Sequence, residues 1–154
     1  MKTDKVLFVC LGNICRSPMA EYVLRYQAQQ AGVGERVEVA SAGTSGWHNG
    51  KDMHPGTAAM LRKHGISPAG FTSSQVHPFD ADSYDWIIAM DDSNIDDLKR
   101  VIRFNTEQTF KLTDLIPESG YFQVPDPWYT GDFDETYRLV SAGSQALLRK
   151  LGLL

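Results

Sequence analysis

Apolar residues along this chain fall into short runs and into longer stretches with helical spacing, and the two kinds alternate. Short β-rich runs predict strands at 5–9, 36–40, 85–90 and 109–112. Helical periodicity, with start and stop signals, predicts helices at 18–31, 55–64, 93–103 and 133–151. Such alternation is typical of an α/β fold, so we expect a mostly parallel sheet with helices on both faces. No linker, repeat or low-complexity tract interrupts it, which predicts one domain over 1–154.

The first predicted strand leads into a segment that reads Cys10-Leu-Gly-Asn-Ile-Cys-Arg16-Ser17-Pro18. Ser17 is a good helix-capping residue and Pro18 suits the first helical position, so a helix is expected to begin here. Gly12 and Asn13 tolerate the unusual backbone angles that a tight loop needs. The sequence therefore predicts a strand, a tight loop that starts with a cysteine, and a helix.

This loop has the chemistry of a phosphate site. Consecutive N–H groups at a helix N-terminus bind the oxygens of a tetrahedral dianion, and Arg16 adds a planar, permanently charged donor. The same field favours a thiolate at Cys10, which would attack a bound phosphoryl group in line. The alternative is a core cysteine and a solvated arginine, but that interpretation gives the surrounding Gly, Asn, Ser and Pro no purpose.

Composition narrows the setting. Only two of the 154 residues are cysteines, and both lie in the loop, which indicates a reducing, cytoplasmic compartment. A formal net charge of -4 without a Lys/Arg block argues against nucleic acid as a partner. No apolar run approaches the ~18 residues of a membrane span, so we expect no membrane partner. The histidines lack metal-ligand spacing and are expected to be surface or satisfied side chains: His48, His54, His64 and His77.

A candidate acid lies in the Pro-rich segment 116–129. Asp126 is flanked by two prolines that stiffen the backbone. If this segment folds over the loop, Asp126 can protonate the oxygen that leaves phosphorus and then take a proton from the attacking water. On its own, an aspartate between prolines is as readily a turn residue.

Three aromatic residues are candidates for the walls of a slot around a flat ring: Trp47, Trp128 and Tyr129. Each could instead be ordinary packing. In open parallel sheets, ligands bind where the carboxyl ends of the strands meet. We therefore expect Cys10, Ser41, Met90 and the segment after Leu112 to share one crevice.

With these segments in view, the chain resembles the low-molecular-weight protein tyrosine phosphatases nearly from end to end. The matching landmarks are Val6 to Pro18, Ser41-Ala-Gly-Thr44 with Trp47, Ala89-Met-Asp91-Asp-Ser-Asn94, and Asp126-Pro-Trp-Tyr129. The resemblance implies a four-stranded parallel sheet with the phosphate-binding loop (P-loop) after the first strand. It also implies that Cys10 is the nucleophile, that Arg16 binds phosphate and stabilises the transition state, and that Asp126 is the general acid.

The family further implies a cysteinyl-phosphate intermediate, with no metal and no cofactor. The phosphate-binding amides would come from Leu11, Gly12, Asn13, Ile14, Cys15 and Arg16, and the Ser17 hydroxyl would stabilise the departing thiolate. Support for the loop is expected from Asn13, Ser17, Ser41 and Asp91. Cys15 matches a second loop cysteine that traps oxidised Cys10 as a reversible disulfide.

Two positions depart from the family pattern. Many relatives have a tyrosine where this chain has Trp128, so regulation by phosphorylation at that tyrosine does not transfer. Relatives often place a histidine of the loop network where this chain has Gly70.

By this resemblance, the substrate is a phosphotyrosine-containing protein or a small aryl phosphate, and phosphate or vanadate inhibits. Two alternatives remain open. An arsenate reductase of the same fold needs further cysteines downstream, and none follows Cys15. A phosphocysteine carrier domain of a sugar-transport system would have no use for Asp126 or an aromatic slot.

Overall fold

Four parallel strands form the centre of the molecule in the computed structural model, which describes residues 2–154. They are β1 (Asp4–Cys10), β2 (Val37–Gly43), β3 (Trp86–Ala89) and β4 (Thr109–Lys111), and they lie in the order β2-β1-β3-β4. The predicted α/β class and four-stranded parallel sheet are confirmed. The chain passes from β1 to β2 on one side and returns to β3 on the other, which opens a crevice beyond the end of β1.

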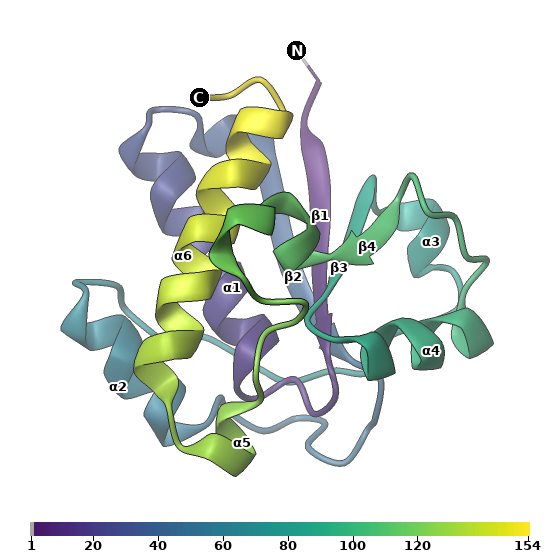
Figure 1. The fold of residues 1–154 in the computed structure, drawn as a ribbon, viewed down its shortest axis with the longest axis horizontal. Helices are drawn as coiled ribbons and strands as arrows, with labels where there is room; N and C mark the ends of the chain where they lie inside the picture. Colours follow the sequence, from purple (N-terminus) through teal and green to yellow (C-terminus); the bar gives the residue numbers. More distant parts are fainter. Residues whose placement is uncertain (1) are drawn as a thin grey trace.

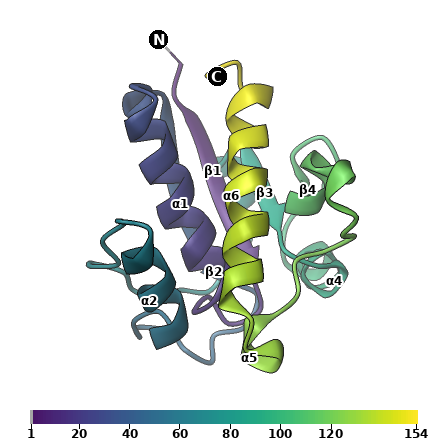
Figure 2. The ribbon, with the colours of Figure 1, turned by 60° about the vertical axis from the view of Figure 1, so that its left-hand side comes forward.

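Helices cover both faces of this sheet (Figures 1 and 2). On one face lie α1 (Arg16–Gln30) and α6 (Phe133–Lys150), with α2 (Pro55–Lys63) beside them. On the other face lie α3 (Asp80–Ser83) and α4 (Asp92–Val101). The two hydrophobic layers between helices and sheet keep β1 rigid, and β1 carries the candidate site.

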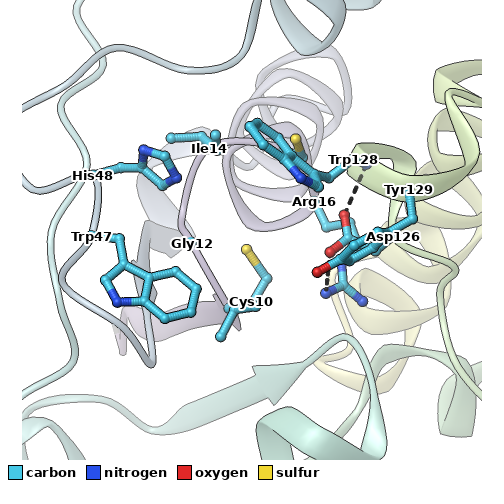
Figure 3. A pocket seen from close by; sticks show the side chains of 11 residues that line it. Cys10, Gly12, Ile14, Arg16, Trp47, His48, Asp126, Trp128 and Tyr129 are labelled. Atoms are coloured by element: carbon cyan, nitrogen blue, oxygen red, sulfur yellow. Dashed lines mark hydrogen bonds and ion pairs between the residues drawn. The ribbon is translucent and has the colours of Figure 1, made fainter.

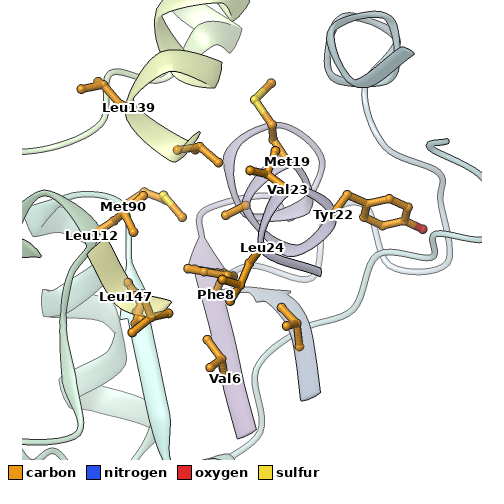
Figure 4. Packing of buried hydrophobic residues seen from close by; sticks show 14 of the residues in the cluster. Val6, Phe8, Met19, Tyr22, Val23, Leu24, Met90, Leu112, Leu139 and Leu147 are labelled. Carbon is orange, nitrogen blue, oxygen red and sulfur yellow. The ribbon is translucent and has the colours of Figure 1, made fainter. Parts of the chain in front are cut away.

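Strand β1 is buried on both sides, because it is central. Its side chains alternate between two clusters: Val6 and Phe8 pack with α1 and α6 (Figure 4), whereas Leu7 and Val9 pack toward α4. A strand buried on both faces reads as a continuous apolar run, which is the pattern that predicted it. Cys10 ends this run at the carboxyl edge of the sheet, with 3% of its surface exposed.

Some predicted boundaries shift. β2 continues to Gly43, so Ser41 lies within the strand and not in the loop that was predicted to begin there. The polar stretch 67–77 pairs with this extension through a parallel bridge between Gly43 and Gln75. The segment predicted as a Pro-rich loop contains the short helices η3 (Pro117–Ser119) and, at its end, α5 (Pro127–Thr130). Short helices of three or four residues carry too little periodicity to be recognised in a sequence.

No helix within residues 2–154 combines the length and the apolar character needed to cross a membrane.

Candidate active site

A pocket opens at the carboxyl end of β1, over the sulfur of Cys10 (Figure 3). Its lining comes from three segments far apart in the sequence. The lining residues are Cys10, Leu11, Gly12, Ile14, Cys15, Arg16, Trp47, His48, Asp126, Trp128 and Tyr129. Ser41 and Met90, which were expected to share this crevice, are not among its lining residues. In Figure 3, Trp47 and His48 lie on one side of the sulfur, and Arg16, Asp126 and Tyr129 lie on the other.

The carbonyls of the loop between β1 and α1 are held by the surrounding scaffold. Backbone N–H groups of Thr44, Ser45 and His54 donate to loop carbonyls at 2.8–3.0 Å. The hydroxyls of Ser73 and Thr57 donate to two more. The carbonyls bound in this way are those of Cys10, Leu11, Asn13, Ile14 and Cys15.

The N–H groups of the same loop, unlike its carbonyls, are not bound by the described part of the scaffold. Within residues 2–154, the backbone N–H groups of residues 11–15 donate no hydrogen bond to a protein acceptor. They precede the N-terminus of α1, where the helix dipole favours an anion. A loop whose carbonyls are engaged outside and whose amides are free is a site for a tetrahedral anion.

The backbone of the loop differs from expectation at Gly12. Asn13 alone among the described non-glycine residues has a positive φ, at 54°, as the left-handed conformation of an asparagine allows. Gly12 does not have a positive φ, so its freedom of angle is not what the loop uses. A Cβ on Gly12 would lie 3.1 Å from Cδ2 of His48, so the glycine leaves room for that ring.

Ser17 does not cap α1, contrary to expectation. The helix begins at Arg16, the capping position is Cys15, and no side chain caps it. The Ser17 hydroxyl lies 3.0 Å from the sulfur of Cys10 and accepts from Nδ2 of Asn13 at 2.9 Å. Pro18 is the third helical residue, still in the first turn, where its missing N–H would have no partner within the helix.

Arg16 is 2% exposed and is held on three sides. Its Nη1 donates to Oδ2 of Asp91 at 2.7 Å and to the carbonyl of Val124 at 2.9 Å, while its Nη2 pairs with Asp126 at 3.4 Å. Burial by itself lowers the pKa of Arg16, but the negative groups Cys10, Asp91 and Asp126 outweigh it and raise the pKa above its ordinary value. The guanidinium is therefore a fixed positive charge beside the sulfur.

Asp91 holds this arginine from the start of α4. Its Oδ1 accepts from the N–H of Asn94 at 2.8 Å, and the Asn94 side chain accepts from the N–H of Asp91, so the pair forms a capping box. The other carboxylate oxygen is left for Arg16. One carboxylate thus ties the end of β3 to the loop after β1.

Asp126 is placed by the backbone on both sides of it. The N–H of Val124 donates to the carbonyl of Met90 at 2.8 Å, which fixes the segment to the end of β3. Asp126 caps α5, because its Oδ1 accepts from the N–H of Trp128 at 3.0 Å. Its Oδ2 accepts from Nη2 of Arg16 at 3.4 Å. Asp126 is therefore both a turn residue and a carboxyl group of the pocket.

Cys15 occupies the capping position of α1 and lines the pocket, with 4% of its surface exposed. Burial, together with the nearby negative groups Cys10 and Asp126, raises its pKa to about 12, although Arg16 opposes the shift. Cys15 is thus a protonated thiol at neutral pH.

The aromatic candidates stand at the mouth of the pocket and are largely exposed: 73% for Trp47, 56% for Trp128 and 79% for Tyr129. Such exposure argues against core packing for Trp47. The ring of Trp128 lies between two histidines, with centroid distances of 6.2 Å to His48 and 5.8 Å to His54.

Sequence reasoning missed several residues that the fold brings to the site: His48, His54, Thr57, Ser73, Ser74 and Val124. Only His48, which directly follows Trp47, carried a signal that could have found it. Gly70 is exposed with a φ of 86°, and a Cβ there would meet open space. The segment that follows Gly70 contacts Asn13 through Ser73 and Ser74, and Asn13 itself donates to Ser41 at 3.0 Å as well as to Ser17.

The histidines engage protein partners. His54 caps α2, since its Nδ1 accepts from the N–H of Gly56, and its ring stacks on Phe133. His64 stacks on Tyr137 and His77 on Phe79. Across residues 2–154, no three His, Cys, Asp or Glu side chains gather as a metal site would require.

The Cys10 thiol lies beside free backbone amides, and an arginine and a carboxyl group lie together on one side of it. These groups define a site for nucleophilic attack on a phosphate ester. Comparison with known proteins agrees. Residues 5–153 match the family model described as low molecular weight phosphotyrosine protein phosphatase. The chain therefore belongs to this family and is a protein-tyrosine-phosphatase.

Individual relatives cover almost the whole chain. The low molecular weight protein-tyrosine-phosphatase YfkJ of Bacillus subtilis is 46% identical over 147 residues, 95% of this chain and 94% of that protein. The crystal structure of YfkJ matches with a TM-score of 0.95 at 44% identity, covering 99% of this chain and 96% of that one. Vibrio vulnificus Wzb, solved in complex with benzylphosphonate, matches with a TM-score of 0.83 at 25% identity, over 96% and 99% of the two chains.

Proposed function

We propose that this chain hydrolyses phosphotyrosine and other aryl phosphate monoesters in two steps, through a phosphate ester of Cys10. The observation that carries the proposal is the loop around the sulfur. Its carbonyls are bound to the scaffold, the amides of residues 11–15 donate to no acceptor in the described part of the chain, and Arg16 lies beside it. These groups would bind the three non-bridging phosphate oxygens and leave the fourth directed away from the sulfur, toward the pocket mouth.

In the first step, the Cys10 thiolate attacks phosphorus, an S–P bond forms, and the bond from phosphorus to the phenolic oxygen breaks. Protonated Asp126 gives its proton to that oxygen, so a neutral phenol leaves. The contact between Arg16 and Asp126, at 3.4 Å the longest that this arginine makes, would open so that Nη2 can bind phosphate. Asp91 and the Val124 carbonyl would keep Nη1 in place.

In the second step, water is the nucleophile. Asp126, now a carboxylate, removes a proton from the water as its oxygen attacks phosphorus, and the S–P bond breaks. Phosphate leaves, Asp126 is again protonated, and the sulfur departs as a thiolate. The Ser17 hydroxyl, 3.0 Å from that sulfur, would stabilise it.

The pocket walls favour a flat substrate group. Trp47, Trp128 and Tyr129 would enclose the ring of an aryl ester, and Leu11 and Ile14 add apolar surface to the pocket lining. The Vibrio relative binds benzylphosphonate, which also joins an aromatic ring to a tetrahedral phosphorus group. The same combination of groups here supports a phosphotyrosine-containing protein or a small aryl phosphate as substrate.

The same proposal extends to the domain organisation, the compartment, the cofactors and the partners of the chain. We propose one catalytic domain over 1–154 that acts in the cytoplasm without a metal or a cofactor, with no nucleic acid or membrane as partner. Inorganic phosphate and vanadate would inhibit by occupying the loop.

Cys15 would protect the nucleophile. A peroxide oxidises the Cys10 thiolate to a sulfenic acid; the sulfur of Cys15 then attacks it, a disulfide forms, and water leaves. A dithiol reductant would reverse the reaction.

The test is turnover of a phosphotyrosine peptide, a phosphoserine peptide and arsenate side by side, each with and without EDTA. We expect phosphate release from the phosphotyrosine peptide only, unchanged by EDTA. Thiol-dependent reduction of arsenate would favour a reductase, and a stable phosphocysteine without phosphate release would favour a carrier domain.

A further inference from the structure

His54 joins the loop after β1 to the starts of α2 and α6. Its backbone N–H donates to the carbonyl of Ile14 in that loop at 2.8 Å. Its Nδ1 accepts from the N–H of Gly56 at 2.9 Å and so caps α2. Its ring stacks on Phe133, the first residue of α6, with 5.1 Å between the ring centroids. The imidazole ring is therefore held in one place by groups from three segments.

The same ring contacts Trp128 of α5. The two centroids lie 5.8 Å apart and the planes are nearly perpendicular, at 82°, which is a favoured arrangement of aromatic rings. Trp128 also lies 6.2 Å from the ring of His48. His48 lines the pocket, whereas His54 is not among the lining residues. His54 can therefore act on the reaction only through the residues that it holds.

The helix α5 depends on such contacts, because four residues are too few to form a stable helix alone. Of these four residues only Pro127 is buried. The carboxyl group of Asp126 is tied to this helix through the N–H of Trp128, the bond drawn as a dashed line in Figure 3. The position of this carboxyl group thus depends on what fixes α5, and the ring pair of Trp128 with His54 is one such contact.

Asp126 loses its other support during the proposed reaction. Nη2 of Arg16 leaves Asp126 in order to bind phosphate, as described above. Of the two hydrogen bonds that the Asp126 side chain makes within residues 2–154, only the capping bond to Trp128 then remains. A general acid must lie within hydrogen-bond reach of the leaving oxygen, and a displacement of about 1 Å is costly. The support of α5 therefore matters most when the substrate is bound.

We propose that His54 is a positioning residue for the general acid: by fixing the ring of Trp128, it keeps Asp126 within reach of the leaving oxygen after Arg16 has turned to phosphate. The proposal rests on the function proposed above, in which Asp126 is the acid. The alternative is that His54 only shapes the aromatic wall of the pocket. A damaged wall would weaken all aryl esters alike, whereas a misplaced acid affects those whose leaving oxygen needs a proton.

The test compares phenyl phosphate with p-nitrophenyl phosphate in the variant His54→Asn. Asparagine is a favoured capping residue, so the cap of α2 and the backbone bond to Ile14 are kept while the ring is lost. We expect kcat/KM to fall about three- to tenfold for phenyl phosphate, the scale of one aromatic pair. It should change less than about twofold for p-nitrophenyl phosphate, since nitrophenolate leaves without a proton. Steady-state kinetics gives both values.

His64→Asn is the matched control. His64 lies at the other end of α2, and its ring also stacks on an aromatic residue of α6, Tyr137. This variant should leave the ratio of the two kcat/KM values unchanged. Trp128→Leu removes the other partner of the ring pair at an exposed position, and should shift that ratio in the same direction as His54→Asn.

A double variant tests whether the effect passes through Asp126. In Asp126→Asn no proton donor remains to be positioned, so adding His54→Asn should cause no further loss with phenyl phosphate. Urea unfolding shows which variants are folded. An unchanged ratio in folded His54→Asn or Trp128→Leu, or a further loss in the double variant, would overturn the positioning role. Failure of the proposed function would look different: the wild-type protein would turn over neither ester.

Discussion

At the scale of single residues, two carboxylates of the site each bind two partners that belong to different segments. Asp91 caps α4 with one oxygen and holds Arg16 with the other. Asp126 caps α5 with one oxygen and faces Arg16 with the other. Because each carboxylate is fixed by a local capping bond, its second oxygen is positioned without further support. A substitution that tests the chemistry of such a carboxylate must therefore keep the oxygen that caps the helix.

Asp126→Asn makes this separation, because the asparagine oxygen can still accept from the Trp128 N–H while the amide cannot supply a proton. We expect kcat with a phosphotyrosine peptide to fall about 10²- to 10⁴-fold. The loss with p-nitrophenyl phosphate should be much smaller, since nitrophenolate leaves without a proton. Steady-state kinetics on both substrates checks this, and equal losses would remove Asp126 from the role of general acid.

Cys15 should remain unreactive while Cys10 reacts. With a pKa of about 12, Cys15 at pH 7 holds roughly one thiolate in 10⁵ molecules, so iodoacetamide should label Cys10 alone, as peptide mass spectrometry would show. After a peroxide pulse, the wild-type protein should regain its activity with dithiothreitol, whereas Cys15→Ser should regain only part. Equal recovery of both proteins would contradict the protective role of Cys15.

At the scale of elements, packing decides positions that helix propensity would assign otherwise. Gly143 lies in the middle of α6, where alanine is favoured by about 1 kcal/mol in an isolated helix. A Cβ there would lie 2.5 Å from Cγ of Leu112, a residue with no exposed surface. The glycine thus allows α6 to approach the segment that follows β4.

Gly143→Ala should therefore destabilise the protein, because the overpacking cost of ~1–3 kcal/mol exceeds the gain in propensity. The neighbouring Ala142→Gly, at an exposed position of the same helix, should also destabilise, by about 1 kcal/mol. Urea unfolding of both variants measures the two changes. A Gly143→Ala protein that is more stable than the wild type would show that the Leu112 contact relaxes without cost.

At the scale of the whole molecule, the pocket exists only when the sheet is complete. The loop after β1, the start of α4 and the segment before α5 meet there, and Arg16 joins all three. A ligand held by these groups binds the folded protein and not the unfolded chain, so its binding free energy adds to the stability of the whole fold.

Phosphate should therefore raise the free energy of unfolding by about 2.7 kcal/mol at a concentration 100 times its Kd. Cys10→Ser should show no turnover of an aryl phosphate but should keep this stabilisation, because the amides and Arg16 remain. Arg16→Ala should lose it. Thermal melts with and without phosphate give the comparison, and a Cys10→Ser protein that still turns over the substrate would reject the nucleophile.

The sequence alone determined what depends on neighbours along the chain. A strand, a tight loop and a helix around Cys10 and Arg16 are local features, and continuous apolar runs mark strands that are buried on both faces. It also indicated the chemistry of Asp126, whose flanking prolines are adjacent to it. The local rule for helix caps failed at Ser17. Ser17 is a favoured capping residue, but its hydroxyl contacts Cys10 and Asn13 instead of capping the helix.

Only the tertiary structure decided which distant groups meet. Arg16 lies 75 residues from Asp91 and 108 from Val124, and no periodicity links such positions. The loop carbonyls are oriented by hydrogen bonds from three other segments, 44–45, 54–57 and 73, and a backbone carbonyl carries no sequence signature of its own. The free amides that would bind phosphate result from those long-range bonds, which form only when the parallel sheet brings its strand ends to one edge.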